Sequence, residues 1–89
     1  FVIFGAGSHT ARLLPQLEQL GVASRIIAIV DNNLNLRGKK LGNFIIQPCD
    51  FLAAMPGCTV LVSSFNAQNA IATQLAGRHP TILLYDLDE

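Results

Sequence analysis

The sequence predicts a single α/β domain with a mostly parallel sheet, and two features of the chain support this. Five short apolar segments, several of them rich in branched side chains, recur along the 89 residues without polar alternation. Such fully apolar strands are typical of a parallel sheet that is covered on both faces. Segments with helical spacing or helix-capping residues separate several of them, as in successive β-α-β units.

The apolar segments define the expected strands and their order. We expect strands at 1–4, 25–30, 44–47, 59–63 and 81–85. Gly5 closes the first strand and Asp31 closes the second. Short connections and right-handed crossovers favour the order 3-2-1-4-5, which is the doubly wound order of a Rossmann-like, three-layer domain.

A helix is expected between the first two strands. Apolar residues recur there at helical spacing, and Gly21 follows them as a stop: Ala11, Leu14, Leu17 and Leu20. Pro15 cannot donate a hydrogen bond to the carbonyl four residues earlier. The sequence therefore predicts either a kinked first turn or a regular helix that starts near Arg12.

The remaining connections carry weaker helical patterns. Residues 50–55, ended by Pro56 and Gly57, predict a short helix, and Asn66 can cap a longer one before Gly77. The apolar stripe of that longer helix contains Ala70, Ile71, Gln74 and Leu75. The Asn, Gly and Lys content of residues 32–43 predicts an irregular loop without a helix.

Composition excludes several classes of partner. Six basic and six acidic residues cancel, and Lys39-Lys40 is the longest basic run, so we expect no nucleic-acid or membrane-surface binding. The apolar runs fall short of the roughly 20 residues of a membrane span, and no signal peptide is recognisable. We therefore expect a cytoplasmic protein without a membrane span.

Length and cysteine content favour one reduced domain. Residues 1–89 suffice for a single core, and Cys49 and Cys58 are expected to be free thiols without a metal. Because Phe1 starts directly in the first strand, we expect a fragment of a larger enzyme with a missing C-terminal domain. The oligomeric state stays open, and a homo-oligomer is compatible with the sequence.

The expected strand order places a ligand crevice between strands one and four, where the winding direction reverses. Residues 5–10 read Gly-Ala-Gly-Ser-His-Thr, which matches the first two glycines of a phosphate-binding GxGxxG turn. Gly5 would permit the tight turn, and Gly7 would open the helix N-terminus to an anion. Thr10 replaces the third glycine and would hold the helix further from the sheet. A tight turn without a ligand is the alternative interpretation.

Polar residues at two further strand ends complete the predicted site. Asp31 could accept hydrogen bonds from a ribose or a base, although Asp31 and Asn32 are also typical turn residues. Across the crevice lie Ser63, Ser64 and Asn66, with Phe65 as an apolar wall, although helix capping would explain a polar residue there equally well. The predicted substrate-binding residues are Gly5, Gly7, Ser8, His9, Thr10, Asp31, Asn32, Ser63, Ser64 and Asn66.

No catalytic residue can be assigned from the sequence. His9 is the catalytic candidate that its residue type suggests, but no acidic neighbour in the sequence orients it, so we expect it to contact ligand or solvent. His79 precedes a proline in a turn and is expected to be solvated. Lys39 and Lys40 are expected at a solvated loop tip from which they could reach a diphosphate.

Three segments together resemble a known family. The segments are residues 1–10, Ile29 to Asn32, and Arg37 to Gly42. They resemble the N-terminal Rossmann-like domain of bacterial nucleotide-sugar acyltransferases of the sialic-acid and bacillosamine type, and related polysaccharide-biosynthesis modules. The resemblance implies that Gly5 and Gly7 lie near the phosphates of a nucleotide-linked sugar and Asp31 near its base. The family's catalytic histidine and acyl-CoA site belong to a β-helix that has no counterpart here.

The sequence thus supports a leading function and two alternatives. The leading hypothesis is a nucleotide-sugar-binding domain of a carbohydrate-modifying transferase in bacterial surface-glycan biosynthesis, with the catalytic residues and any acyl-CoA in a further domain and no cofactor in this one. The first alternative is an NAD(P)-binding domain of an oxidoreductase or epimerase, which Thr10 and the missing sixth strand disfavour. The second is a regulatory or assembly module without a ligand.

Overall fold

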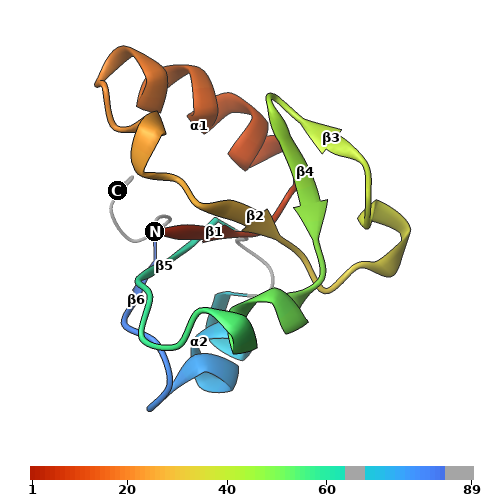
Figure 1. Ribbon diagram of the computed structural model, residues 1–89, viewed down its shortest axis with the longest axis vertical. Helices are drawn as coiled ribbons and strands as arrows, with labels where there is room; N and C mark the ends of the chain where they lie inside the picture. The colour runs from red at the N-terminus through yellow and green to blue at the C-terminus, as the bar shows by residue number, and fades with distance from the viewer. Residues whose placement is uncertain (64–67, 84–89) are drawn as a thin grey trace.

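The chain folds into a small α/β domain around a mixed, mostly parallel sheet of six strands (Figure 1). The computed structural model describes residues 1–63 and 68–83. The sheet has the order β3-β4-β2-β1-β5-β6. Its strands are β1 (Val2–Phe4), β2 (Ala28–Val30), β3 (Lys40–Leu41), β4 (Phe44–Gln47), β5 (Val60–Val62) and β6 (Thr81–Leu83). Only β3 is antiparallel to its neighbour, and the other pairs are parallel.

The observed sheet differs from the expected one at a single edge. The five expected strands keep their relative order, but β3 adds a sixth, so the expected five-stranded order is not matched exactly. Gly42, with φ at 60°, makes the tight turn that folds β3 back onto β4. The expectation of a helix-free loop at 32–43 was also wrong. A 3₁₀ helix, η2 (Leu34–Leu36), forms there, and Asn33 caps it through a side-chain bond from the Asn35 N–H.

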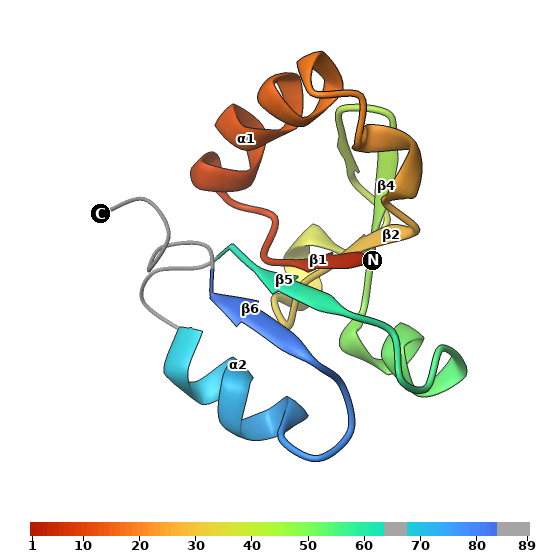
Figure 2. The same ribbon diagram turned by 90° about the vertical axis from the view of Figure 1, so that its left-hand side faces the viewer.

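Helices cover both faces of the sheet and make three layers (Figure 2). Helix α1 (Ser8–Gln19) covers one face, while the 3₁₀ helix η3 (Cys49–Ala54) and helix α2 (Gln68–Leu75) cover the other. A third short 3₁₀ helix, η1 (Ala23–Arg25), leads from α1 into β2. The expected short helix at 50–55 is therefore present as η3, and the expected cap of α2 at Asn66 lies outside the described residues.

Helix α1 runs without interruption through Pro15, so the expected start near Arg12 was wrong. The proline leaves the Ala11 carbonyl without its usual intrahelical donor. Pro15 and Ala11 are both exposed, so water can hydrate that carbonyl. This hydration makes the proline tolerable in the middle of the helix.

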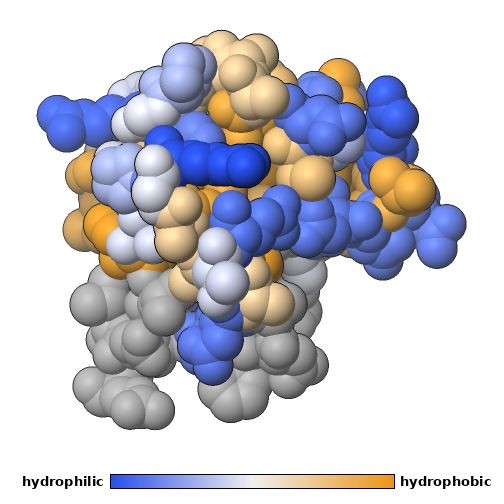
Figure 3. Space-filling model, turned by 90° about the horizontal axis from the view of Figure 1, so that it is seen from below, coloured by the Kyte–Doolittle hydropathy of each residue, from blue (hydrophilic) through white to orange (hydrophobic). Residues whose placement is uncertain are grey.

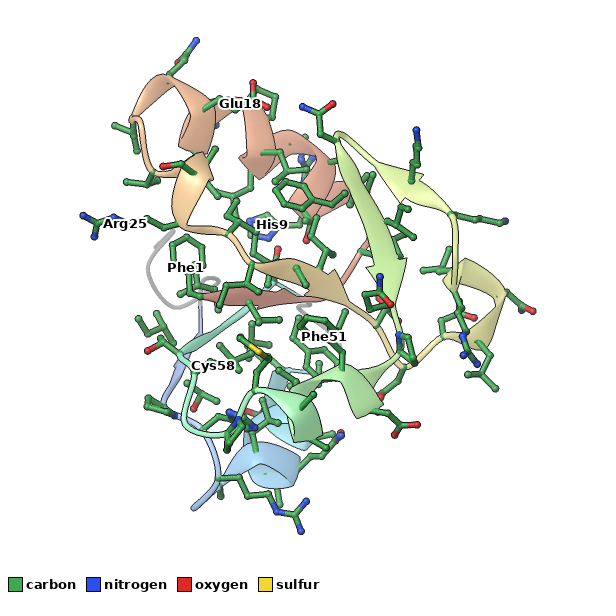
Figure 4. All side chains as sticks on the ribbon, in the orientation of Figure 1. Phe1, His9, Glu18, Arg25, Phe51 and Cys58 are labelled. Atoms are coloured by element: carbon green, nitrogen blue, oxygen red, sulfur yellow. The ribbon has the colours of Figure 1, made fainter. Side chains whose placement is uncertain are left out.

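Two hydrophobic clusters fill the space between the layers. Ile3 and Ile29 pack with Leu14 of α1 on one face of the sheet. The cluster on the other face contains Val2, Phe4, Val30, Leu52, Val60, Val62, Ile71 and Leu75. Figure 4 shows Phe51 and Cys58 on the second side, where they pack against that cluster. The strands are therefore buried from both sides, which explains their lack of polar alternation.

The outer surface mixes hydrophilic and hydrophobic residues on the face seen in Figure 3. Within residues 1–63 and 68–83, no helix is long and apolar enough to cross a membrane.

Candidate functional site

The crevice that topology predicts would lie at the carboxyl ends of β1 and β5, which are neighbours in the sheet. From β1 the chain continues to β2 and β4 on one side, while from β5 it continues to β6 on the other. The Ser63 N–H donates to the Phe4 carbonyl over 2.8 Å, and the Gly5 N–H donates to the Val30 carbonyl over 2.8 Å. These two bonds continue the sheet by one residue and bring the Gly5 turn directly beside the end of β5.

The two glycines of the turn have different physical roles. Gly5 is buried and adopts φ of 119°, a conformation that residues with a Cβ rarely tolerate. Gly7 has φ of −91° and ψ of −164°, which any residue can adopt. A Cβ built on Gly7 would meet no atom within 4 Å. Gly5 is thus required by the backbone, whereas the fold does not require a glycine at position 7.

The N-terminus of α1 is open where Gly7 precedes it. Gly7 is the N-cap residue and has no side chain to cap the helix, and the first turn contains no acidic residue. The Ala11 N–H makes the first intrahelical bond, to the Gly7 carbonyl over 3.1 Å. The N–H groups of the three residues between them have no acceptor inside the helix. Such a terminus favours an anion through its N–H groups and its dipole.

Thr10 connects the turn to the end of β5. Its side chain is fully buried, and its Oγ1 lies 2.6 Å from the Gly5 carbonyl oxygen and 2.8 Å from Ser63 Oγ. Ser63 Oγ in turn lies 2.7 Å from His9 Nδ1. The residue that replaces the third glycine therefore ties the first turn of α1 to the sheet through hydrogen bonds.

The protons in this chain of contacts can be assigned by counting. Each hydroxyl carries one hydrogen, and the Gly5 carbonyl can only accept. Thr10 must therefore donate to Gly5, and Ser63 must donate to Thr10. The short contact between Ser63 and His9 then needs its proton from His9 Nδ1. These printed contacts are all satisfied when the neutral His9 ring carries its hydrogen on Nδ1.

His9 lies on the α1 side of the sheet and is half-buried (Figure 4). It lines an open cavity of about 320 Å³ together with Arg12, Leu13 and Gln16. A guanidinium group and an imidazole therefore share one cavity beside the first turn of α1.

Asp31 holds the glycine-rich turn through its carboxylate. Its Oδ2 accepts from the Ala6 N–H over 2.8 Å, and its Oδ1 accepts from the Asn33 N–H over 2.8 Å. Both oxygens thus bind backbone groups, one in the turn after β1 and one in the turn after β2. These contacts agree with the alternative interpretation of Asp31 as a turn residue. Its contact with a ligand stays a prediction.

The other predicted residues are not part of the hydrogen-bonded contacts described above. Asn32 is exposed, and its Nδ2 lies 3.4 Å from Gln74 Oε1 of α2. Lys39 and Lys40 are exposed at the β3 edge, with β4 and β2 between that edge and β1. Ser8 is the first residue of α1, and its side chain is not described. Ser64, Phe65 and Asn66 lie outside the described residues.

His79 was expected to be solvated, and that expectation was wrong. Its ring is half-buried, with Nδ1 at 3.2 Å from the Cys58 carbonyl oxygen and 3.6 Å from Cys58 Sγ. The carbonyl needs a donor, so Nδ1 carries the hydrogen and cannot act as a base toward the thiol. Cys49 and Cys58 are free thiols. The described part of the chain contains no group of three or more His, Cys, Asp or Glu residues that could hold a metal ion.

Sequence reasoning missed Gln68, the first residue of α2. Its Oε1 is buried and has no hydrogen-bond partner within the described part of the chain. The sequence gives one indirect signal, since Gln68 precedes the buried Ile71 and Leu75 by three and seven positions and so shares their face of the helix.

Comparison of the chain with family models, with curated proteins and with solved structures finds no significant match. The resemblance to nucleotide-sugar acyltransferases therefore stays a prediction from the sequence.

Proposed function

We propose that this chain is a Rossmann-type domain that binds a nucleotide-activated sugar and serves a carbohydrate-modifying transferase of bacterial surface-glycan biosynthesis. The observation that carries this proposal is the N-terminus of α1 after β1, where Gly7 is the N-cap and an added Cβ would meet no atom within 4 Å. Ligands of open α/β sheets bind at this kind of position.

The electrostatics of the turn support a phosphate group there. The uncapped N–H groups of α1 and its dipole favour an anion, and no acidic side chain lies in its first turn. Arg12 lines the cavity that begins beside His9 and adds a positive charge on the next turn. Asp31 contacts the turn, and its two oxygens are already bound to backbone N–H groups.

The chain supplies binding groups rather than a reaction centre. His9 contacts Ser63 through Nδ1 and lines the cavity. We assign it a role in ligand contact and place the chemistry in a further domain. An acyl-CoA, where the transferred group is an acyl group, would bind in that further domain too.

A pair of substitutions at Gly7 tests the phosphate site. Asp and Asn are equally good N-caps and have similar size, so Gly7→Asp and Gly7→Asn should both fold and gain a few tenths of a kcal/mol in stability. Only the aspartate places a negative charge where the phosphate would lie. In calorimetric titrations with UDP and UDP-N-acetylglucosamine, we expect Gly7→Asp to bind about tenfold or more weakly than Gly7→Asn.

The outcomes separate the proposal from its alternatives. Equal affinities of the two variants for UDP would place the phosphates away from α1 and contradict the proposed site. Saturable binding of NAD, but of neither UDP compound, would indicate the oxidoreductase or epimerase domain instead. Absence of binding by the wild-type chain to all three compounds would favour the regulatory or assembly module.

A further inference from the structure

Gln68 carries a buried polar atom that the fold leaves unpaired. Its Oε1 has no contact with solvent and no hydrogen-bond partner among residues 1–63 and 68–83, although the residue as a whole is half-buried. A buried carbonyl oxygen without a donor costs free energy, and native structures rarely leave one without a reason. The Gln68 Oε1 therefore lacks the hydrogen-bond donor that a buried carbonyl oxygen normally has.

Gln68 belongs to the first turn of α2, at the end of the sheet where the ligand is expected. Gln68 begins α2 and follows Ser63 of the His9 network by only five positions. It shares the sheet-facing side of α2 with Ile71 and Leu75. Figure 2 shows the first turns of α1 and α2 at the same end of the sheet, beyond the carboxyl end of β1, with one helix on each face. The first turns of α1 and α2 thus lie at the same end of the sheet, where the ligand crevice is expected.

We propose that Gln68 is a ligand-recognition residue, whose side-chain amide accepts a hydrogen bond from an N–H or O–H donor of the bound nucleotide sugar. This role rests on the function proposed above. Because Oε1 has no partner in the free protein, turning the amide toward a ligand breaks no hydrogen bond of that oxygen. The donor is either a ring N–H or hydroxyl of the nucleoside or a hydroxyl of the sugar, since phosphate oxygens can only accept at neutral pH.

The substitution Gln68→Met tests this role, with Gln74→Met as the matched control. Methionine keeps an unbranched side chain of similar length and removes the polar atoms. Gln74 lies on the same helix and is exposed, and its Oε1 lies 3.4 Å from Asn32 Nδ2. In titrations with UDP and UDP-N-acetylglucosamine, we expect Gln68→Met to bind at least about fivefold more weakly than wild type, and Gln74→Met to bind within twofold of it.

Thermal unfolding of the free proteins gives a second readout. Removing an unpaired buried amide should leave the melting temperature of Gln68→Met unchanged or raise it, so lost affinity would not reflect a damaged fold. Gln68→Leu provides a second apolar replacement if the methionine packs poorly. A loss for both UDP compounds would assign the donor to the nucleoside, and a loss for the UDP-sugar alone would assign it to the sugar.

The results that overturn the role differ from those that overturn the proposed function. If wild type binds the UDP compounds and Gln68→Met binds them equally well, the recognition role is wrong while the nucleotide-sugar function stands. If wild type binds neither UDP compound, the proposed function fails first and the role of Gln68 fails with it.

Discussion

Replacement of the buried Thr10 by valine should destabilise the domain strongly, although the two side chains have nearly the same shape. The Thr10 hydroxyl bonds to the Gly5 carbonyl and contacts Ser63 Oγ, at 2.6 and 2.8 Å. Valine leaves the Gly5 carbonyl without this donor and Ser63 without this acceptor. An unsatisfied buried group costs about 1–3 kcal/mol.

The expected loss can be bounded from the network. Ser63 can turn its hydrogen toward His9 Nδ1 and recover one bond, provided that the neutral ring moves its own hydrogen to Nε2. The Gly5 carbonyl has no such substitute within the network. We therefore expect Thr10→Val to cost about 2–3 kcal/mol in the free energy of unfolding. For a domain of this size that corresponds to a drop of roughly 10–20 °C in Tm.

Thr10→Ser is the matched control, because serine keeps the hydroxyl and removes only the methyl group. Its loss should be nearer 1 kcal/mol, the value of a buried methyl group. Urea unfolding of the three proteins measures the order wild type, Thr10→Ser, Thr10→Val. A valine variant as stable as wild type would refute the hydrogen-bond network, and so would a serine variant less stable than the valine variant. Ring ¹⁵N shifts in NMR spectra of the neutral His9 should report the hydrogen on Nδ1 in wild type.

Three further substitutions test the turn. Asp31→Asn keeps one acceptor oxygen but turns an NH₂ group toward a backbone N–H, so urea unfolding should show a loss of about 1.5–3 kcal/mol. Gly5→Ala should lose about 1–3 kcal/mol because of the positive φ, whereas Gly7→Ala should stay within about 1 kcal/mol of wild type. Equal losses at the two glycines would contradict their different roles. Ser63→Ala should cost about 1–2 kcal/mol and should remove the preference of neutral His9 for Nδ1, which NMR of the ring nitrogens can detect.

The parallel part of the sheet was predictable because its signals are local. Strands such as Val2–Phe4 and Val60–Val62 are apolar throughout, and a glycine or a polar residue follows each one. Topology then places the ends of β1 and β5 side by side, and the structure has this adjacency. The pairing of Lys40–Leu41 with β4 was not predictable, because a two-residue strand has no recognisable period and depends on the turn at Gly42.

The role of Thr10 shows why the geometry of the site could not be read from the sequence. From the glycine pattern, Thr10 was expected to push the helix away from the sheet. In the structure it faces the sheet and bonds to Ser63, a residue 53 positions away. A motif read in one segment cannot reveal a partner that a distant strand supplies. The same holds for His79, whose contact with Cys58 spans 21 positions.

Asp31 shows how a structural role limits what a functional experiment can mean. Asp31→Ala would remove the acceptor of the Ala6 N–H and disturb the turn that carries the proposed phosphate site. A loss of ligand affinity in that variant would therefore follow whether or not Asp31 touches the ligand. Gly7 has the opposite property, since it makes no contact that a side chain would break and its backbone suits any residue. Binding at this turn is consequently best tested at Gly7, because a substitution there can change ligand affinity without removing a contact that the fold needs.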